Sequence, residues 1–337
     1  MPRFSLVFLT LFTLLRTVGL PEAVLGNESL KSVTRQAYLM GTKVHLSVRT
    51  SDRAAGLIQL EQMLKVLEKT EAELSTWRAE SLVSRLNRHP INQVWHADLE
   101  FCNLFKKLAR WHQETNGAFD PVVGDLLHNQ ENESNISEPS TKALFGFKYL
   151  NFDGKDCTVV RLRDVSVDAG AFGKGQALDR VEQTLEEFAK PWMIDIGGQL
   201  MVSGLAETES WPFAIANPIH RMRTVLNLNL KDGSISVSGG SERDRLVNGV
   251  RLGHILDPRS GRPVNDAGSV IVWHRKALLA DILSTAIFVM GVEEGIRWAD
   301  ERGIAACFIV PGDSVVEKAE EFRFVSTRAF RAQFSLP

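Results

Sequence analysis

The sequence predicts an α+β fold of mixed, largely antiparallel sheets packed with helices. Three observations support this class. Short apolar strands occur in groups and do not alternate strictly with helices, as they would in a doubly wound parallel sheet. Several segments repeat apolar residues at helical spacing. The chain has 337 residues, 44% of them hydrophobic, and no Pro/Ser-rich linker divides it, so one compact unit is expected.

The first half of the chain predicts one strand and two helices. Residues 43–48 alternate polar and apolar side chains as a half-buried strand does, and residues 57–67 repeat leucine at helical spacing. A second helix around residues 104–108 should end at the Asn-Gly pair at 116–117, because these residue types tolerate the positive φ found after a helix. The polar stretch at 128–141 predicts an exposed loop or insertion.

The second half predicts short strands separated by glycine-containing turns. These strands span residues 158–162, 192–196, 213–216, 225–230, 234–237 and 269–273. Helices at 174–188 and 278–290 interrupt them. Residues 27–337 are therefore interpreted as a single domain with a polar insertion near 128–141.

The N-terminus predicts export. Arg3 precedes an apolar run at residues 4–15, and a turn-prone segment at 19–21 follows. About a dozen apolar residues fall short of the roughly 20 that span a membrane, so residues 1–26 are expected to be a signal peptide or, if uncleaved, a signal anchor. The expected location is the periplasm or the outer side of the inner membrane, and an uncleaved anchor would associate the protein with that membrane.

Charge and cysteine content exclude several classes of protein. A formal net charge of -2, with basic residues scattered among acidic ones, argues against a nucleic-acid partner. Cys102, Cys157 and Cys307 are widely spaced, which excludes a disulfide framework and metal sites built on C-x-x-C pairs. Cys102 and Cys307 lie in apolar segments and are expected to be core residues. One disulfide is compatible with an oxidising compartment, but the sequence assigns no pair.

The segment from Ala280 to Ala286 contains candidate metal ligands. On a helix, Asp281 and Thr285 are four residues apart and project from the same face, which brings a carboxylate and a hydroxyl together. Two such oxygen ligands suit a hard cation, and Mg²⁺ also leaves positions for water and a substrate phosphate. The alternative is an acidic residue near the start of its helix, favoured there by the helix dipole.

A glycine-rich connection at residues 168–175 is a candidate phosphate site. Three glycines and Lys174 lie between a predicted strand and a predicted helix, where backbone N–H groups and a positive charge can meet a phosphate. The segment matches neither a Walker A motif nor a dinucleotide G-x-G-x-x-G motif, and a plain glycine-rich turn explains it equally well. Further glycine turns at 195–198 and 237–243 could converge on the same ligand.

His254 is a candidate general base because it precedes a turn that contains Asp257 and Pro258. The Asp-Pro and Ser-Gly steps of residues 257–261 are typical of a loop. A lone histidine is more often structural, and the sequence alone leaves both interpretations open.

Taken together, these segments resemble the ApbE family of FAD:protein FMN transferases over residues 40–290. Agreement among several ordered motifs is more specific than any single motif. The matching segments are Met40-Gly41-Thr42, Leu74-Ser75-Thr76-Trp77, Gly117-Ala118-Phe119-Asp120-Pro121, Asp168 to Lys174, His254 to Gly261 and Ala280 to Ala286.

The resemblance implies a T-fold-like architecture, a reaction and a set of site residues. FAD would be cleaved, its FMN half joined through a phosphoester to a Ser or Thr of an acceptor flavoprotein, and AMP released. Mg²⁺ would be held by Asp281, Thr285 and the Ala171 carbonyl, with His254 as general base and Asp257 as its alternative. FAD would be bound by Met40, Trp77, Ala118, Phe119, Asp120, Asp168, Lys174 and Ile255.

The chain departs from the family pattern at three places. It has Gly170-Ala171 where Gly-Gly is usual, Phe172-Gly173 where an Ile-Ala pair is usual, and Ser241 where an aromatic residue is usual. The second and third departures bear on the shape of the adenine or flavin pocket. Three other functions stay open: an FAD pyrophosphatase that gives free FMN and AMP, a non-catalytic exported flavin-binding protein, and a structural exported protein.

Overall fold

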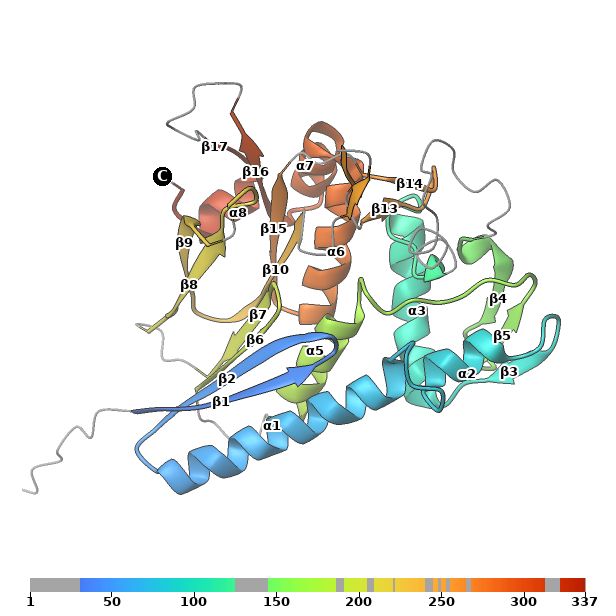
Figure 1. Ribbon diagram of the computed structural model, residues 1–337, viewed down its shortest axis with the longest axis horizontal. Coiled ribbons are helices and arrows are strands. Elements are labelled where there is room, and N and C mark those ends of the chain that lie inside the picture. The colour runs from blue at the N-terminus through green and yellow to red at the C-terminus, as the bar shows by residue number, and fades with distance from the viewer. Residues whose placement is uncertain are drawn as a thin grey trace, which may run out of the picture.

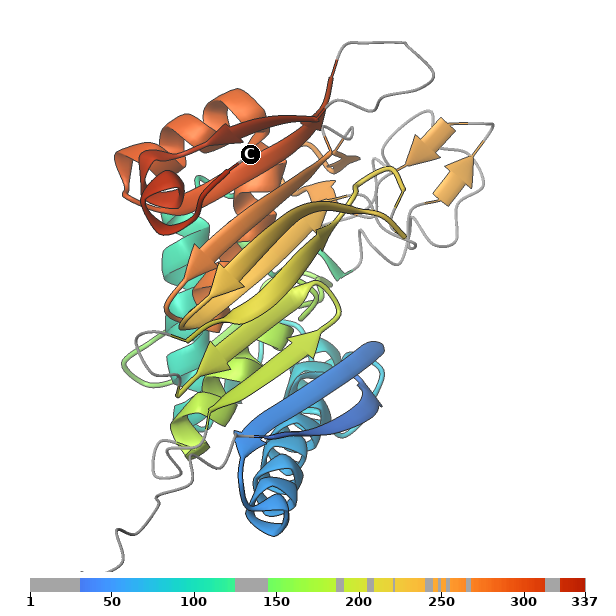
Figure 2. The same ribbon diagram turned by 90° about the vertical axis from the view of Figure 1, so that its left-hand side faces the viewer.

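The central feature of the fold is an eight-stranded sheet, seen face on in Figure 2. The computed structural model describes residues 31–124, 145–185, 191–204, 209–220, 222–239, 245–247, 250–252, 255–264, 268–312 and 322–336. The strand order is β1-β2-β6-β7-β10-β15-β16-β17, and every neighbouring pair is antiparallel. The α+β class with largely antiparallel sheets is therefore confirmed.

The strands of this sheet are β1 (Lys31–Leu39), β2 (Thr42–Thr50), β6 (Trp192–Ile196), β7 (Gln199–Ser203), β10 (Gly233–Gly239), β15 (Ser269–His274), β16 (Ala305–Pro311) and β17 (Phe322–Ser326). Smaller sheets contain β3 (Val94–His96), β4 (Leu150–Asp153) and β5 (Thr158–Arg161), then β8 (Trp211–Ala216) with β9 (Thr224–Leu230), β11 (Arg245–Val247) with β12 (Val250–Leu252), and β13 (Leu256–Asp257) with β14 (Arg262–Pro263). The helices are α1 (Arg53–Leu74), α2 (Leu82–Arg88), α3 (Leu99–Glu114), η1 (Phe147–Tyr149), α5 (Gly173–Leu185), α6 (Ala277–Met290), α7 (Val292–Glu301) and α8 (Arg328–Gln333).

Helices α1, α5 and α6 cover one face of the sheet (Figure 1). The alternate residues Val44, Leu46 and Val48 of β2 are buried on this face with the leucines of α1. The β8–β9 hairpin and α8 cover part of the opposite face and enclose a separate apolar cluster. The sheet is thus the middle layer of three, as burial of both its faces requires.

Helix α6 lies between the sheet and a second core formed by α2, α3 and the β3-β5-β4 sheet. Its apolar side chains contact both sides, and of its 14 residues only Leu279 and Thr285 are not buried. A helix that is apolar all round is expected to be enclosed in this way. Thr285 is thus a polar side chain at one of the few places where α6 reaches the surface.

The predicted elements and the observed ones agree in most of the described chain. The strand predicted at 43–48 is β2, the leucine repeat lies within α1, and Asn116 and Gly117 after α3 have positive φ of 49° and 75°. The sequence analysis missed β1, β3, β4, β7, β11 to β14, β16, β17, α2, η1, α7 and α8. Only two of the nine residues of β1 are buried, and five consecutive residues of β16 are buried, so neither strand alternates.

Several N-terminal and loop predictions cannot be compared with the structure. The signal segment at 1–26, the polar insertion at 128–141 and the last residues of the helix predicted at 174–188 lie outside the described residues. Within the described ranges, no helix combines the length and apolar character that crossing a membrane requires.

A disulfide joins Cys102 of α3 to Cys157, which lies between β4 and β5. The sequence analysis expected Cys102 to be a core residue and assigned no disulfide pair; Cys102 is indeed buried, and it is one of the two bonded cysteines. The two cysteines are 55 residues apart and meet because the β3-β5-β4 sheet packs on α3, a contact that residue spacing does not reveal. Cys307 is free and buried, as expected, and burial raises the pKa of its thiol to about 12.

Reduction of this disulfide is expected to lower the free energy of unfolding by about 2 to 4 kcal/mol, because the bond limits the unfolded chain. Urea unfolding of the mature protein with and without dithiothreitol measures the difference. The Cys102→Ser/Cys157→Ser variant is the control and should not respond to the reductant. An equal response from the wild type and this variant would show that the pair is not bonded in solution.

Candidate active site at the junction of α5 and α6

The glycine-rich segment before α5 is held by hydrogen bonds from distant parts of the chain. The side-chain amide of Asn87 in α2 donates to the Val167 carbonyl over 2.9 Å and accepts from the Val167 N–H over 2.8 Å. The Asp168 N–H donates to the Pro121 carbonyl over 2.8 Å. Phe172 is buried in the core shared by α3 and α6. The segment is therefore fixed at both ends, and sequence analysis had not identified Asn87 as one of its anchors.

The Asp168 side chain shapes the turn that follows it. Its Oδ1 accepts the Gly170 N–H over 2.7 Å, and a Cβ added to Gly170 would lie 2.7 Å from the same oxygen. A side chain at position 170 would therefore disturb this hydrogen bond. The structure explains why glycine stands here without reference to a ligand.

Asp281 of α6 meets the first turn of α5. Its side chain is buried, with 2% of the residue exposed, and its Oδ2 accepts the Gly175 N–H over 2.9 Å. Lys174 Nζ lies 3.6 Å from Oδ1. A buried carboxylate needs such compensation, because removing an unpaired charge from water costs several kcal/mol. A hydrogen bond and an ion pair to one buried carboxylate therefore connect α5 and α6.

The Gly175 hydrogen bond has a consequence for Ala171. In a regular helix the Gly175 N–H would donate to the Ala171 carbonyl four residues earlier. Here it donates to Asp281, and α5 begins at Gly173, so within the described part of the chain no helical N–H donates to that carbonyl. Backbone carbonyls usually have a hydrogen-bond partner, and a carbonyl without one can instead bind a hard cation.

Asp281 and Thr285 lie on α6 as their spacing predicts. Thr285 is half-buried, and its Oγ1 donates to the Asp281 backbone carbonyl over 3.3 Å. The alternative interpretation of Asp281 as an acid of the first helical turn is not supported, because α6 begins at Ala277 and has no acidic residue in its first turn.

The donor set suits a hard cation. It consists of the Asp281 carboxylate, the Thr285 hydroxyl and the Ala171 carbonyl, all oxygen atoms of the kind that Mg²⁺ prefers. Among the described residues, no group of three His, Cys, Asp or Glu side chains could hold a metal. A site at this junction would therefore depend on neutral oxygens, water and substrate phosphate besides its single carboxylate.

Gly175 is required by the packing of the two helices. A Cβ at this position would lie 2.5 Å from the Ala277 carbonyl oxygen and 2.6 Å from Leu278 Cα. The sequence analysis left open whether these glycines approach a ligand or form a plain connection, and at Gly175 the closely approaching group is the backbone of α6. At Gly173 the nearest atoms are side-chain carbons of Ala169 at 3.3 Å and Met40 at 3.4 Å.

Three serines tie α6 to the central sheet. Ser284 Oγ donates to the Asp281 carbonyl over 3.0 Å and lies 3.0 Å from Ser236 Oγ, while Ser238 Oγ donates to Ser284 Oγ over 2.9 Å. All three side chains are buried. Strand β10 thereby fixes the turn of α6 that carries the candidate ligands, a role that the sequence analysis had not assigned to these serines.

Met40 and Trp77 follow the ends of β1 and α1, and Met40 lies beside the first residue of α5. The Met40 N–H donates to Glu71 Oε1 over 2.7 Å, its φ is 52°, and its methyl group approaches Gly173. Trp77 is 83% exposed and follows α1 directly. Met40 therefore lies beside the start of α5 and Trp77 has an exposed ring; the resemblance assigns both to dinucleotide binding.

The Gly117 to Pro121 segment is mostly internal. Ala118 and Phe119 are 0% and 1% exposed, so neither residue presents a surface to a ligand, and the binding role that the resemblance implied for them is not supported. The Asp120 carboxylate accepts the N–H groups of Val122 over 2.8 Å and Phe147 over 2.9 Å. Burial raises the pKa of Asp120, although these hydrogen bonds and nearby His112 oppose the shift. The position of Asp120 indicates a structural link between two loops.

Ile255 and Asp257 lie on the β13 side of α6. Ile255 is half-buried between two apolar clusters. Asp257 accepts hydrogen bonds from Arg259 through the backbone N–H over 2.8 Å, Nε over 3.0 Å and Nη2 over 3.1 Å. These donors occupy lone pairs that a proton acceptor would need. His254, the other base candidate, lies outside the described residues.

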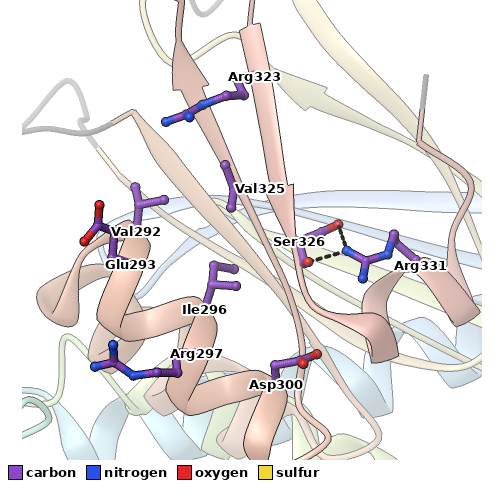
Figure 3. Close-up of a pocket in the computed structure, with 9 residues that line it drawn as sticks. All are labelled: Val292, Glu293, Ile296, Arg297, Asp300, Arg323, Val325, Ser326 and Arg331. Atoms are coloured by element: carbon purple, nitrogen blue, oxygen red, sulfur yellow. Dashed lines mark hydrogen bonds between the residues drawn. The ribbon is translucent and has the colours of Figure 1, made fainter.

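A cavity of about 340 Å³ lies elsewhere, between α7, β17 and α8 (Figure 3). Arg331 hydrogen-bonds to Ser326 at its edge. Its lining residues are Val292, Glu293, Ile296, Arg297, Asp300, Arg323, Val325, Ser326 and Arg331. No predicted site residue is among them, so this cavity is separate from the α5–α6 junction.

Comparison with known proteins identifies the family. The model of the ApbE family matches residues 40–308. The FAD:protein FMN transferase of Vibrio cholerae serotype O1 is 29% identical over 262 residues, which cover 74% of this chain and 78% of that protein. The FAD:protein FMN transferase of Escherichia coli K12 is 27% identical over 82% of this chain and 83% of its own length.

Solved structures agree with these matches. The ApbE protein of Thermotoga maritima has a TM-score of 0.80 and 27% identity, over 91% of this chain and all of that one. The flavin transferase ApbE of Vibrio cholerae has a TM-score of 0.76 and 26% identity, over 90% and 99%. These similarities place the chain among the transferases. It belongs to the ApbE family.

Gly175→Ala is expected to destabilise the protein by about 1 to 3 kcal/mol, because the added methyl group cannot fit between α5 and the backbone of α6. Gly173→Ala is the matched control in the same helical turn and meets only side-chain carbons, so its effect should be smaller. Chemical denaturation of both variants gives the comparison. Equal stability of the two would contradict the close helix contact described above.

Proposed function

We propose that this protein is an exported, Mg²⁺-dependent FAD:protein FMN transferase. The arrangement of oxygen atoms at the α5–α6 junction supports the proposal most directly: a buried carboxylate on Asp281, a half-buried hydroxyl on Thr285, and the Ala171 carbonyl. The names of the relatives supply the reaction, since the chain matches these transferases over most of its length.

The chain's own residues would bind and orient the pyrophosphate of FAD. Lys174, 3.6 Å from Asp281, adds positive charge beside the candidate metal ligands. When bound, Mg²⁺ would neutralise negative charge on the pyrophosphate and on the leaving AMP. Phosphoryl transfer depends mainly on positioning and charge stabilisation, which a junction fixed by two helices can provide.

The dinucleotide would extend from this junction over Met40 and Trp77. The exposed indole of Trp77 offers ring area on which an isoalloxazine can stack, and the Met40 methyl group lies beside the start of α5. Asp168, which holds the turn before α5, and Ile255 are assigned to dinucleotide binding by the resemblance, whereas the buried Ala118, Phe119 and Asp120 would support the junction from within.

The proposed reaction exchanges one phosphorus–oxygen bond for another. The acceptor Ser or Thr oxygen bonds to the phosphorus of the FMN half, while the bond from that phosphorus to the bridging oxygen breaks and AMP leaves with this oxygen. The hydroxyl proton moves to a base. The family resemblance assigns this role to His254, and Asp257 is the weaker choice because Arg259 already engages its carboxylate.

Export follows from the predicted signal at residues 1–26, and the Cys102–Cys157 disulfide supports an oxidising compartment. The acceptor would then be a flavoprotein on the outer side of the inner membrane. A fusion of residues 1–26 to alkaline phosphatase tests this, because alkaline phosphatase is active only after export. An inactive fusion would contradict the proposed location.

The direct test is a transfer assay with purified protein, FAD, Mg²⁺ and candidate acceptor peptides that contain Ser or Thr. We expect a covalent FMN adduct by intact mass and one AMP for each adduct. Excess EDTA should stop both products and spare FAD binding, because stacking needs no cation.

Asp281→Ala should lower the rate at least about a hundredfold, the scale for losing a key electrostatic group. His254→Asn should lower it by about 10² to 10⁴.

The same assay separates the alternatives. Free FMN and AMP without an adduct would identify an FAD pyrophosphatase, and tight FAD binding without AMP release would identify a carrier. AMP release that persists in EDTA would remove the metal from the mechanism.

A further inference from the structure

We propose that Asp179 is a positioning residue for the reaction, because it joins the N-terminus of α6 to α5 and thereby sets the position of Asp281 and Thr285. This inference rests on the proposed function and adds a residue that does not touch the substrate. The hydrogen bonds of Asp179 with the backbone of α6 support this inference.

Asp179 supplies the N-terminal cap of a helix other than its own. It is 5% exposed, and its Oδ1 accepts the Ala277 N–H over 2.6 Å while Oδ2 accepts the Leu278 N–H over 3.4 Å. The residue at the cap position of α6 is Lys276, whose side chain makes no capping hydrogen bond. The first N–H groups of a helix lack partners within it, and an acidic group there is also favoured by the helix dipole.

A second contact lies one turn away on each helix. Gly175 precedes Asp179 by four residues, and Asp281 follows Ala277 by four residues, so each pair shares one helix face. Asp179 binds the Ala277 N–H, and the Gly175 N–H binds Asp281. Helices α5 and α6 are thus joined at two points with matching spacing, and the two contacts together fix their register.

Close packing makes this register strict. Gly175 leaves no space for a Cβ beside the Ala277 carbonyl, and Gln199 Nε2 donates to the same carbonyl over 2.8 Å. Lys276 Nζ also pairs with Glu182 Oε2 of α5 over 2.6 Å. Loss of the Asp179 contact would remove the bond from α5 to the first N–H groups of α6 and loosen the end nearest to the candidate metal ligands, although Gln199 still binds the Ala277 carbonyl and Ser284 still binds β10.

The effect expected is that of a residue that orients a metal ligand. Replacement of such outer groups typically weakens metal binding by about 10- to 100-fold. If Asp179 only caps a helix, its replacement by Asn would lose the charge–dipole interaction, about 0.3 to 1 kcal/mol of stability, and leave metal affinity unchanged. Metal affinity and stability therefore separate the two roles.

The experiment compares Asp179→Asn with Asp98→Asn in the otherwise complete mature protein. Asp98 caps α3 by accepting the Phe101 N–H over 2.8 Å and lies outside the α5–α6 junction. Asp98→Asn therefore removes one capping charge, as Asp179→Asn does, but at a different helix. Mn²⁺ is the metal probe, and electron paramagnetic resonance of free Mn²⁺ in the presence of FAD gives the dissociation constant. Thermal unfolding, kcat and the KM for FAD are measured beside it.

We expect Asp179→Asn to weaken Mn²⁺ binding at least about tenfold and to lower kcat with little change in KM. Asp98→Asn should lower the melting temperature only slightly, because the amide oxygen can still accept the Phe101 N–H, and should leave Mn²⁺ affinity unchanged. Wild-type Mn²⁺ affinity in a folded Asp179→Asn protein would overturn the inference. If the wild type binds Mn²⁺ and the variant binds it weakly, but neither transfers FMN, the positioning role stands and the proposed function fails.

A second variant keeps the inference testable if Asp179→Asn is too unstable. Lys276→Ser gives α6 a capping residue of its own, so Asp179→Asn/Lys276→Ser should regain stability relative to Asp179→Asn. It should not regain Mn²⁺ affinity, because the link to α5 is still missing. Recovery of both would show that Asp179 is only a cap. Lys276→Ser alone is the control for loss of the pair with Glu182.

Discussion

One buried negative charge sets the constraint on which the rest of the structure depends. Asp281 is 2% exposed, and a carboxylate held away from water is costly unless hydrogen bonds and opposite charge compensate it. Both compensating groups, the Gly175 N–H and the Lys174 ammonium group, come from the first turn of α5. If either helix moved alone, the buried Asp281 carboxylate would lose its hydrogen bond from Gly175 and its ion pair with Lys174. The same hydrogen bond leaves the Ala171 carbonyl without its helical partner, so the oxygen that the family resemblance proposes as a third metal ligand is not engaged by the helix.

The wider fold holds the two helices in this position. The serines of β10 bind the middle of α6, and Asn87 of α2 holds the chain that leads into α5. Helix α6 is enclosed by the central sheet on one side and the second core on the other, and in Figure 1 it stands between them. Rigid elements thus surround a junction whose chemistry requires fixed distances, as sites that act by positioning need.

The fold class and several elements were predictable because they depend on local periodicity. The alternation in β2 and the leucine repeat in α1 are properties of consecutive residues, and the pair Asp281 and Thr285 follows from helical spacing alone. The remaining features depend on contacts between distant residues. Asn87 and Asp179 act on backbone groups 80 and 98 residues away, and Cys102 bonds a residue 55 positions along the chain. Gly175 shows the same limit: the sequence indicates a close approach at this position but not that the approaching group is α6.

The central claim is that α5 and α6 together form one site for a divalent cation and a pyrophosphate. Anomalous diffraction from crystals grown with Mn²⁺ and FAD tests it most directly. The account predicts one strong manganese peak at about the 2.1 Å typical of a hard cation from the Asp281 carboxylate, the Thr285 hydroxyl and the Ala171 carbonyl, with the pyrophosphate completing the shell. A manganese peak bound to other residues, with Asp281 still held only by Gly175 and Lys174 beside a bound FAD, would contradict it.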